Sequence, residues 1–156
     1  MTTKLYIKIA HYIATLGYCG YITYAPGTVA SMITVVSLYI LPDFSWQITI
    51  MFAIILFVLS VWSSRLTSFF LNHKDPSCIV IDEVFGMYVA TMFLPKTSVL
   101  YFCAFFLFRL FDITKPYPIN ALEKIDYRGL NIVIDDGFAG LLTLGLIFLS
   151  MFIFSF

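Results

Sequence analysis

Charged residues are scarce in this chain of 156 residues. Asp and Glu together number nine, Lys and Arg also number nine, and the formal net charge is zero. The basic residues are dispersed along the sequence, which argues against the phosphate-neutralising surface of a nucleic-acid-binding protein. Hydrophobic residues make up 61% of the chain and the mean hydropathy is +0.95, above the roughly 45–50% apolar content of soluble domains. The composition therefore predicts a membrane protein with no nucleic-acid partner.

Histidine and cysteine are also rare. The two histidines are too few for lipid phosphatases that act through several positioned histidines, and we interpret His73 as a surface-loop residue. The three cysteines are odd in number and have no metal-ligand spacing, so we expect buried free thiols. Cys103 and Arg109 have the C-x5-R spacing of thiol-dependent phosphatases, but the apolar residues between them indicate a helix, whereas a phosphate cradle needs a loop of exposed amides.

The sequence contains no Ser-, Gly- or Pro-rich linker, and its length is that of one domain. The first residues lack the short apolar core and cleavage site of a removable signal peptide, so we expect them to be retained. We predict one domain over 1–156, with an interfacial helix in 1–20 and a helical catalytic core over 25–156.

The predicted interfacial helix covers residues 4–16. Lys4, Lys8 and His11 fall on one face of this helix, among apolar residues. That pattern suits a helix lying on an anionic leaflet, and an ordinary amphipathic helix that caps a core fits equally well.

Long apolar runs dominate the rest of the chain. The runs 44–64 and 137–156 carry no charge and have the length that a helix needs to cross a bilayer. Shorter runs at 29–41, 84–94 and 97–111 are separated from their neighbours by Leu-Pro-charged turns, as in helical hairpins. The sequence therefore predicts an all-α, multihelical, membrane-associated bundle built from helical hairpins. The run 29–41 reaches only about 20 Å, so some helices are expected to be half-inserted.

If both hairpin tips point the same way, the polar segments between the hairpins emerge together at the opposite end. That end would hold all the bases except Lys96. The positive-inside rule would therefore assign this base-rich end to the cytoplasm. Alternatively, the bases gather there to bind an anion. These bases are Lys4, Lys8, Arg65, Lys74, Arg109, Lys115, Lys124 and Arg128.

Four of the nine acids occur in two similar segments, IVIDEVFG at 79–86 and IVIDDGFAG at 132–140. Charges beside apolar helices are costly and commonly functional, and Mg²⁺ prefers carboxylate oxygens together with a substrate phosphate. Helix capping is the alternative, since each pair is expected at a helix N-terminus. The candidate metal ligands are Asp82, Glu83, Asp112, Asp135 and Asp136, of which Asp82, Asp112 and Asp135 are the candidate catalytic acids.

Bases suited to a phosphate lie between the two acid pairs, in FRLFDITKPYPI at 108–119. Arg109 is a candidate phosphate ligand, and an ion pair with Asp112 one helical turn away is its alternative. Lys115 is a second candidate, because the following Pro-Tyr-Pro bend ends the helix and directs the lysine. Arg128 is interpreted as solvated. Thr28, in APGT, either receives a phosphoryl oxygen at a helix N-terminus or caps that helix.

Taken together, the segments APGTVAS, DPSCIVIDEVFG, FRLFDITKPYPI and IVIDDGFAG resemble the phosphatidylglycerophosphatase A family in order and spacing, over about residues 20–150. The resemblance implies an all-helical, membrane-associated enzyme that removes the terminal phosphate of phosphatidylglycerophosphate in a Mg²⁺-dependent reaction. It also implies phospholipid biosynthesis at the bacterial inner membrane, and the distribution of bases leads us to expect a site that faces the cytoplasm. The family's motif acids match the five candidate acids and Asp75, and its bases match Arg109 and Lys115.

The reaction type agrees with the residues, since a metal site can activate water and stabilise a transferring phosphoryl group. We favour water activated by the metal over a phospho-aspartate at Asp82, because the doubled acid pairs suggest a metal cluster. Two alternatives are a lipid phosphotransferase, which would require a nucleotide-activated lipid, and a divalent-cation transport protein, whose acids would line a path through the membrane.

Overall fold

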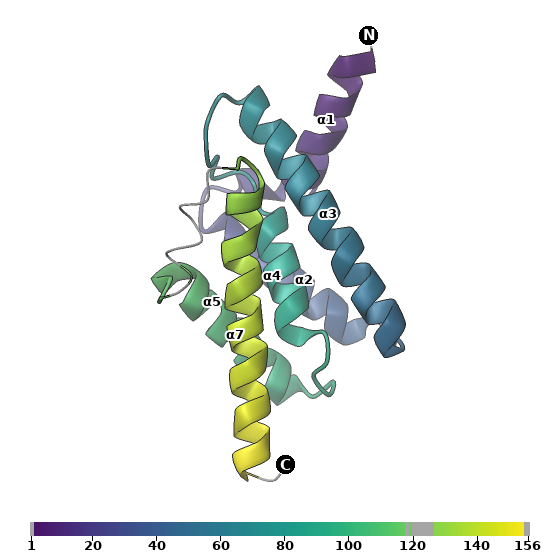
Figure 1. The fold of residues 1–156 in the computed structure, drawn as a ribbon, viewed down its shortest axis with the longest axis vertical. Helices are drawn as coiled ribbons and strands as arrows, with labels where there is room; N and C mark the ends of the chain where they lie inside the picture. The colour runs from purple at the N-terminus through teal and green to yellow at the C-terminus, as the bar shows by residue number, and fades with distance from the viewer. Residues whose placement is uncertain (1, 118, 120–126, 155–156) are drawn as a thin grey trace.

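The computed structural model describes residues 2–117, 119 and 127–154. Every regular element in these residues is a helix. The predicted all-α bundle is therefore confirmed (Figure 1). In chain order the elements are α1 (Thr2–Ala14), a short 3₁₀ helix η1 (Cys19–Tyr21), α2 (Pro26–Ile40), α3 (Trp46–Phe70), α4 (Ile81–Thr91), α5 (Ser98–Thr114) and α7 (Leu130–Phe154).

Two helices, α3 and α7, are long and apolar enough to cross a membrane. Each has 25 residues, which is about 37 Å of helix against a hydrocarbon core of about 30 Å. They cover most of the two predicted long runs. The helix α3 begins at Trp46 and continues past Ser64 to Phe70, and α7 begins seven residues before Gly137. The helix α2 has 15 residues and is too short to cross alone, as expected.

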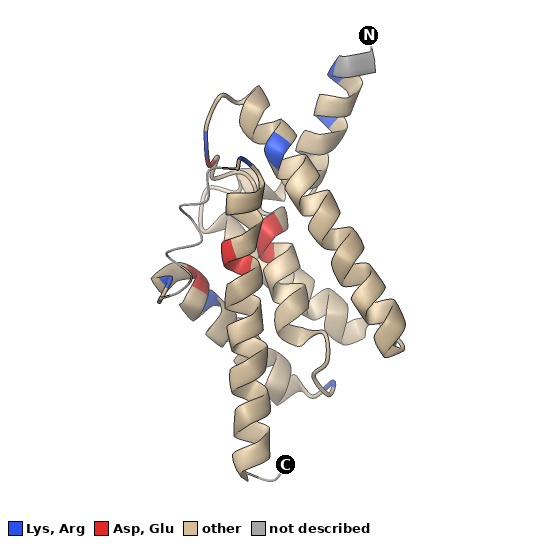
Figure 2. Ribbon diagram, viewed as in Figure 1, with Lys and Arg blue, Asp and Glu red and all other residues tan. Residues whose placement is uncertain are grey.

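The two hairpin tips meet at one end of the bundle. The Lys96 ammonium lies 3.1 Å from the Asp43 carboxylate and also donates a hydrogen bond to the Leu41 carbonyl. Both tips therefore point the same way, which is the condition considered from the sequence. Figure 2 shows most Lys and Arg residues toward the other end, around α1 and the start of α7. Lys124 lies outside the described residues.

The helix α4 lies at the centre of the bundle and contacts α2, α3, α5 and α7. Its closest neighbour is α7, because the two helices meet at glycines. A Cβ atom on Gly140 would lie 2.3 Å from the Gly86 carbonyl oxygen, and one on Gly137 would lie 2.8 Å from the Phe85 ring. Gly145, by contrast, has open space beside it. The close approach of α4 and α7 therefore depends on Gly137 and Gly140.

The helix α1 packs against α3, with small residues on both helices. Ala10 and Ala14 of α1 are fully buried, as are Ser60 and Ser64 of α3. The opposite side of α1 exposes large apolar side chains, including Leu5, which is 60% exposed. The predicted amphipathic helix is therefore present and covers part of the core, and its contact with a membrane surface stays a prediction.

Candidate active site

The first acid pair lies in the first turn of α4, as predicted. The helix begins at Ile81 and its N-cap residue is Val80, so neither Asp82 nor Glu83 is the capping residue. Both residues keep some exposure, but Asp82 Oδ1 and Glu83 Oε2 are shut off from solvent and accept no hydrogen bond from the described part of the chain. Capping therefore does not explain this pair.

The second acid pair lies in the second turn of α7, and the prediction that it sits at the helix N-terminus was wrong. The helix begins at Leu130, because the apolar residues before the acids are already helical and buried against the bundle. Asp135 and Asp136 are 5% and 4% exposed. Each has one carboxylate oxygen that is buried without a hydrogen-bond partner among the described residues. The capping alternative is excluded for this pair as well.

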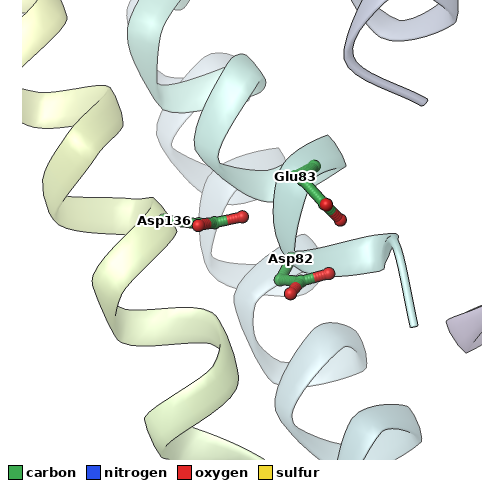
Figure 3. Close-up of side chains that lie close together, drawn as sticks. All are labelled: Asp82, Glu83 and Asp136. Carbon is green, nitrogen blue, oxygen red and sulfur yellow. The ribbon is translucent and has the colours of Figure 1, made fainter. Parts of the chain in front are cut away.

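Three acids from the two similar segments converge between α4 and α7. Asp82, Glu83 and Asp136 each offer a carboxylate oxygen, and these oxygens lie within 4.8 Å of one another. Figure 3 shows Asp136 pointing from α7 toward the two acids of α4. Buried carboxylates that lack partners are expensive unless a cation compensates them. An all-oxygen group of this kind fits the ligand preference of Mg²⁺.

The environment of the first acid pair supports the same conclusion. Burial, with added charge repulsion from Glu83, raises the pKa of Asp82 well above its ordinary value. Burial also raises the pKa of Glu83, where Asp112 adds repulsion and Arg109 partly opposes the shift. Without a cation these side chains resist ionising together, so a bound cation would stabilise their charged forms.

The remaining two candidate acids are each held by a base. Asp112 lies 2.6 Å from Arg109 on α5, so the intrahelical ion pair considered as an alternative is present. Asp135 lies 2.7 Å from the Lys115 ammonium, which reaches it from the end of α5. The backbone of Lys115 is left-handed, with φ of 41°, and its N–H donates to the Phe111 carbonyl. The predicted end of the helix at this lysine is confirmed.

All five acids and both bases line one pocket of about 550 Å³. Its wall also includes the start of α2 and the loop before α4. The side chains of Arg109 and Asp112 are 15% and 13% exposed, and that of Lys115 is 30% exposed. The pocket therefore places two cationic groups and the carboxylate cluster around one space. This arrangement can hold a phosphate group beside a divalent cation.

The start of α2 contributes its backbone, and the prediction for Thr28 needs correction. Ala25, which has φ of 46°, is the N-cap and Pro26 opens the helix, so Thr28 does not cap it. Ala25, Pro26 and Gly27 line the pocket, whereas Thr28 is not among its lining residues, because successive helical side chains point about 100° apart. A Cβ atom on Gly27 would lie 1.9 Å from Glu83 Oε1 and 3.3 Å from Arg109 Nη1. Glycine is what permits this approach.

Sequence reasoning missed Asn131. This residue is 5% exposed, lines the pocket and has a side-chain oxygen with no hydrogen-bond partner among the described residues. Its position four residues before Asp135 was the available signal, because that spacing places both on one helix face. His73 and Lys74 also line the pocket from the exposed loop before α4, together with Asp75.

Two other residues lie away from this pocket. The Arg128 guanidinium lies over the Phe69 ring, 4.9 Å from its centre, which argues against a role in phosphate binding. Cys103 is exposed on α5, so the expectation of a buried thiol was wrong there, although Cys78 is buried. The Cys103 to Arg109 segment is helical and cannot form a phosphate loop, as predicted.

Comparison with known proteins places the chain in a family. The sequence model described as Phosphatidylglycerophosphatase A matches residues 12–151. The chain belongs to the phosphatidylglycerophosphatase A family. It is therefore an enzyme of the phosphoric monoester hydrolase class, and its two long apolar helices agree with a bacterial membrane protein. The resemblance stated from the motifs is confirmed.

Curated relatives agree with that assignment. A phosphatidylglycerophosphatase A of Escherichia coli is 29% identical over 79% of this chain and 72% of its own length. Another from Haemophilus influenzae is 31% identical, over 83% of this chain and 80% of its own. A Bacteroides thetaiotaomicron protein that is provisionally named a phosphatidylinositol-3-phosphatase is 31% identical, over 82% and 84%. No solved structure matches the chain.

Proposed function

We propose that this enzyme hydrolyses the terminal phosphate monoester of phosphatidylglycerophosphate to phosphatidylglycerol, in a Mg²⁺-dependent step of phospholipid biosynthesis. The observation that carries the proposal is the group of Asp82, Glu83 and Asp136, whose ligand oxygens lie within 4.8 Å of one another in a pocket that also holds Arg109 and Lys115. Family membership supports the reaction and the substrate.

In this proposal each side chain has a defined task. Asp82, Glu83 and Asp136 hold the cation, and Asp135 and Asp112 border it. When bound, Mg²⁺ neutralises charge on the transferring phosphoryl group and lowers the pKa of water at the site. Arg109 and Lys115 bind the phosphate oxygens, and they can exchange their present carboxylate partners for those oxygens.

Asp112 and Asp135 are the acids best placed for proton transfer in this proposal. Each is paired with a base that would turn toward the phosphate, which would free a carboxylate beside the reacting water. We keep water as the nucleophile, because the acids of the two similar segments act together as a ligand group. A phospho-aspartate at Asp82 would instead leave a labelled protein after reaction with ³²P substrate.

We place the enzyme in the bacterial inner membrane with its pocket facing the cytoplasm. The support is the distribution of charge, since most Lys and Arg residues lie at the pocket's end of the bundle (Figure 2). The phosphotransferase and transport alternatives lose support because the chain belongs to a phosphatase family.

The direct test measures phosphate release by the purified full-length chain in mixed micelles, with Mg²⁺ or with EDTA. The panel contains phosphatidylglycerophosphate, phosphatidylinositol-3-phosphate and phosphatidic acid, since one relative bears a phosphoinositide phosphatase name. We expect Mg²⁺-dependent release, fastest from phosphatidylglycerophosphate. Release from another ester only, or equal release in EDTA, would overturn the proposal.

A further inference from the structure

The helices α2 and α5 form an apolar groove of about 300 Å³ on the outside of the bundle. Its walls include Met32 and Val36 of α2 and Phe102 of α5, which are 47%, 49% and 65% exposed. Such side chains are expensive to expose to water but suit the hydrocarbon of a membrane. The groove therefore needs an apolar occupant.

The two helices run in opposite directions, so the start of α2 and the end of α5, which both border the active-site pocket, lie at the same end of the groove. At its far end the rings of Tyr39 and Tyr101 lie 5.4 Å apart. At the near end the start of α2 approaches the end of α5, where a Cβ atom on Gly27 would lie 3.3 Å from Arg109 Nη1. The two helices that form the groove thus meet beside Arg109, a base of the pocket wall.

The faces of the two helices continue from the groove into the pocket. On α5, Phe105 lines the groove, and Arg109 and Asp112 follow it by four and seven residues on the same helix face. On α2, Met32 follows Thr28 by four residues on one face. Thr28 itself is not among the lining residues of the groove or of the pocket.

The dimensions agree with one acyl chain. Tyr39 follows Gly27 by twelve residues along α2, which corresponds to roughly 18 Å of helix. One leaflet contributes half of a hydrocarbon core of about 30 Å. A chain lying along this groove would thus reach about the middle of the bilayer.

A second apolar groove lies between α3, α4 and α7. It is lined by Phe85, Ile134 and Gly137. No residue of α5, the helix that carries Arg109, lines this groove, so it does not border that phosphate-binding base. It offers a matched control surface of similar chemistry.

We propose that the groove between α2 and α5 binds an acyl chain of the lipid substrate while the phosphate lies at Arg109. This inference rests on the proposed lipid phosphatase function. Because the groove is half-open, the chain would enter sideways from the leaflet. The enzyme would then distinguish long-chain esters from short-chain esters through KM.

The test fills the groove and compares substrates. Met32→Trp and Val36→Trp narrow it, and Ile54→Trp and Leu141→Trp fill the control groove. Phosphate release is measured from long-chain and from dihexanoyl phosphatidylglycerophosphate. We expect the first two variants to raise KM for the long-chain ester about tenfold more than for the short-chain ester, a loss equal to a few buried methylenes. The control variants should leave the ratio unchanged.

A second measurement needs no variant. A phosphate-monoester lipid with a photoactivatable diazirine near its acyl terminus should label α2 and α5 near Tyr39 and Tyr101 in the wild-type enzyme. Three results would overturn the inference. They are equal KM changes for both esters, the same effect from Ile54→Trp, and labelling concentrated on α3. Failure of the wild-type enzyme to release phosphate from either ester would instead count against the proposed function, and the labelling would still decide the groove.

Discussion

Gly140 of α7 lies so close to Gly86 of α4 that a Cβ atom on Gly140 would be 2.3 Å from the Gly86 carbonyl oxygen. Each glycine follows an acid of the cluster by four residues, Asp82 on α4 and Asp136 on α7, so the acids sit one turn from the contact. The approach of the two backbones therefore sets the separation of the carboxylates.

Gly140→Ala should push α4 and α7 apart. The added methyl group meets backbone, which cannot move aside as a flexible side chain would, so we expect a loss of about 1–3 kcal/mol in stability and weaker cation binding. Gly145→Ala is the matched control, because open space lies beside Gly145. It should be neutral or stabilising by up to about 1 kcal/mol. Denaturant unfolding in detergent compares the two, and equal stabilities would contradict the role of the glycine contact.

Removing one charge from the cluster should remove catalysis without unfolding the protein. Asp136→Asn keeps the shape of the side chain but loses a metal ligand, so we expect phosphate release in Mg²⁺ to fall at least about a hundredfold. Asp43→Asn, at the hairpin tips, is the control, since Asp43 is exposed and pairs only with Lys96 among the described residues. Near-normal activity of Asp136→Asn would exclude this residue as a ligand.

Arg109→Ala should weaken substrate binding and leave Asp112 without its partner. Charge-assisted hydrogen bonds are worth about 1.5–3 kcal/mol, so kcat/KM should fall roughly 10- to 100-fold. Arg109→Lys should recover part of that loss, because lysine keeps the charge but not the fork of donors. Arg128→Ala serves as the matched control, since Arg128 stacks on Phe69 away from the pocket. Equal losses for Arg109→Ala and Arg128→Ala would show that net charge alone matters.

The stability gained from Mg²⁺ should grow with pH. Burial raises the folded-state pKa of Asp82 and Glu83, so without a cation the folded protein binds more protons than the unfolded chain above the ordinary carboxyl pKa of about 4. The metal-free protein therefore loses stability as pH rises through that range toward the raised values. Mg²⁺ binds the ionised acids and opposes this loss. Melting temperatures in Mg²⁺ and in EDTA should converge near pH 5 and separate near pH 8. A pH-independent difference would contradict the placement of the cation at these acids.

Much of this arrangement follows from short-range sequence patterns. The Leu-Pro-charged turns predicted the hairpin tips that Lys96 and Asp43 join, and the two similar segments predicted the acids that converge. Both are local signals of helix ends and of charge beside apolar helices.

Other features depend on tertiary contacts that no local pattern specifies. Gly27 approaches Glu83 and Arg109 from a third helix, and this approach was not predictable from the segment APGT alone. The second acid pair lies inside α7 because the buried residues before it extend the helix. Thr28 was misplaced because the sequence does not show where that helix begins, and Ala25 takes an unusual left-handed conformation there.

Direct cation binding tests the central claim. Mn²⁺ shares the oxygen-ligand preference of Mg²⁺ and is visible by electron paramagnetic resonance, so its binding to the purified enzyme can be measured without substrate. We predict saturable binding that Mg²⁺ displaces and that Asp82→Asn and Asp136→Asn each weaken by at least about tenfold, whereas Asp43→Asn does not. Equal Mn²⁺ affinity in all of these proteins would show that the acids of α4 and α7 do not hold the cation.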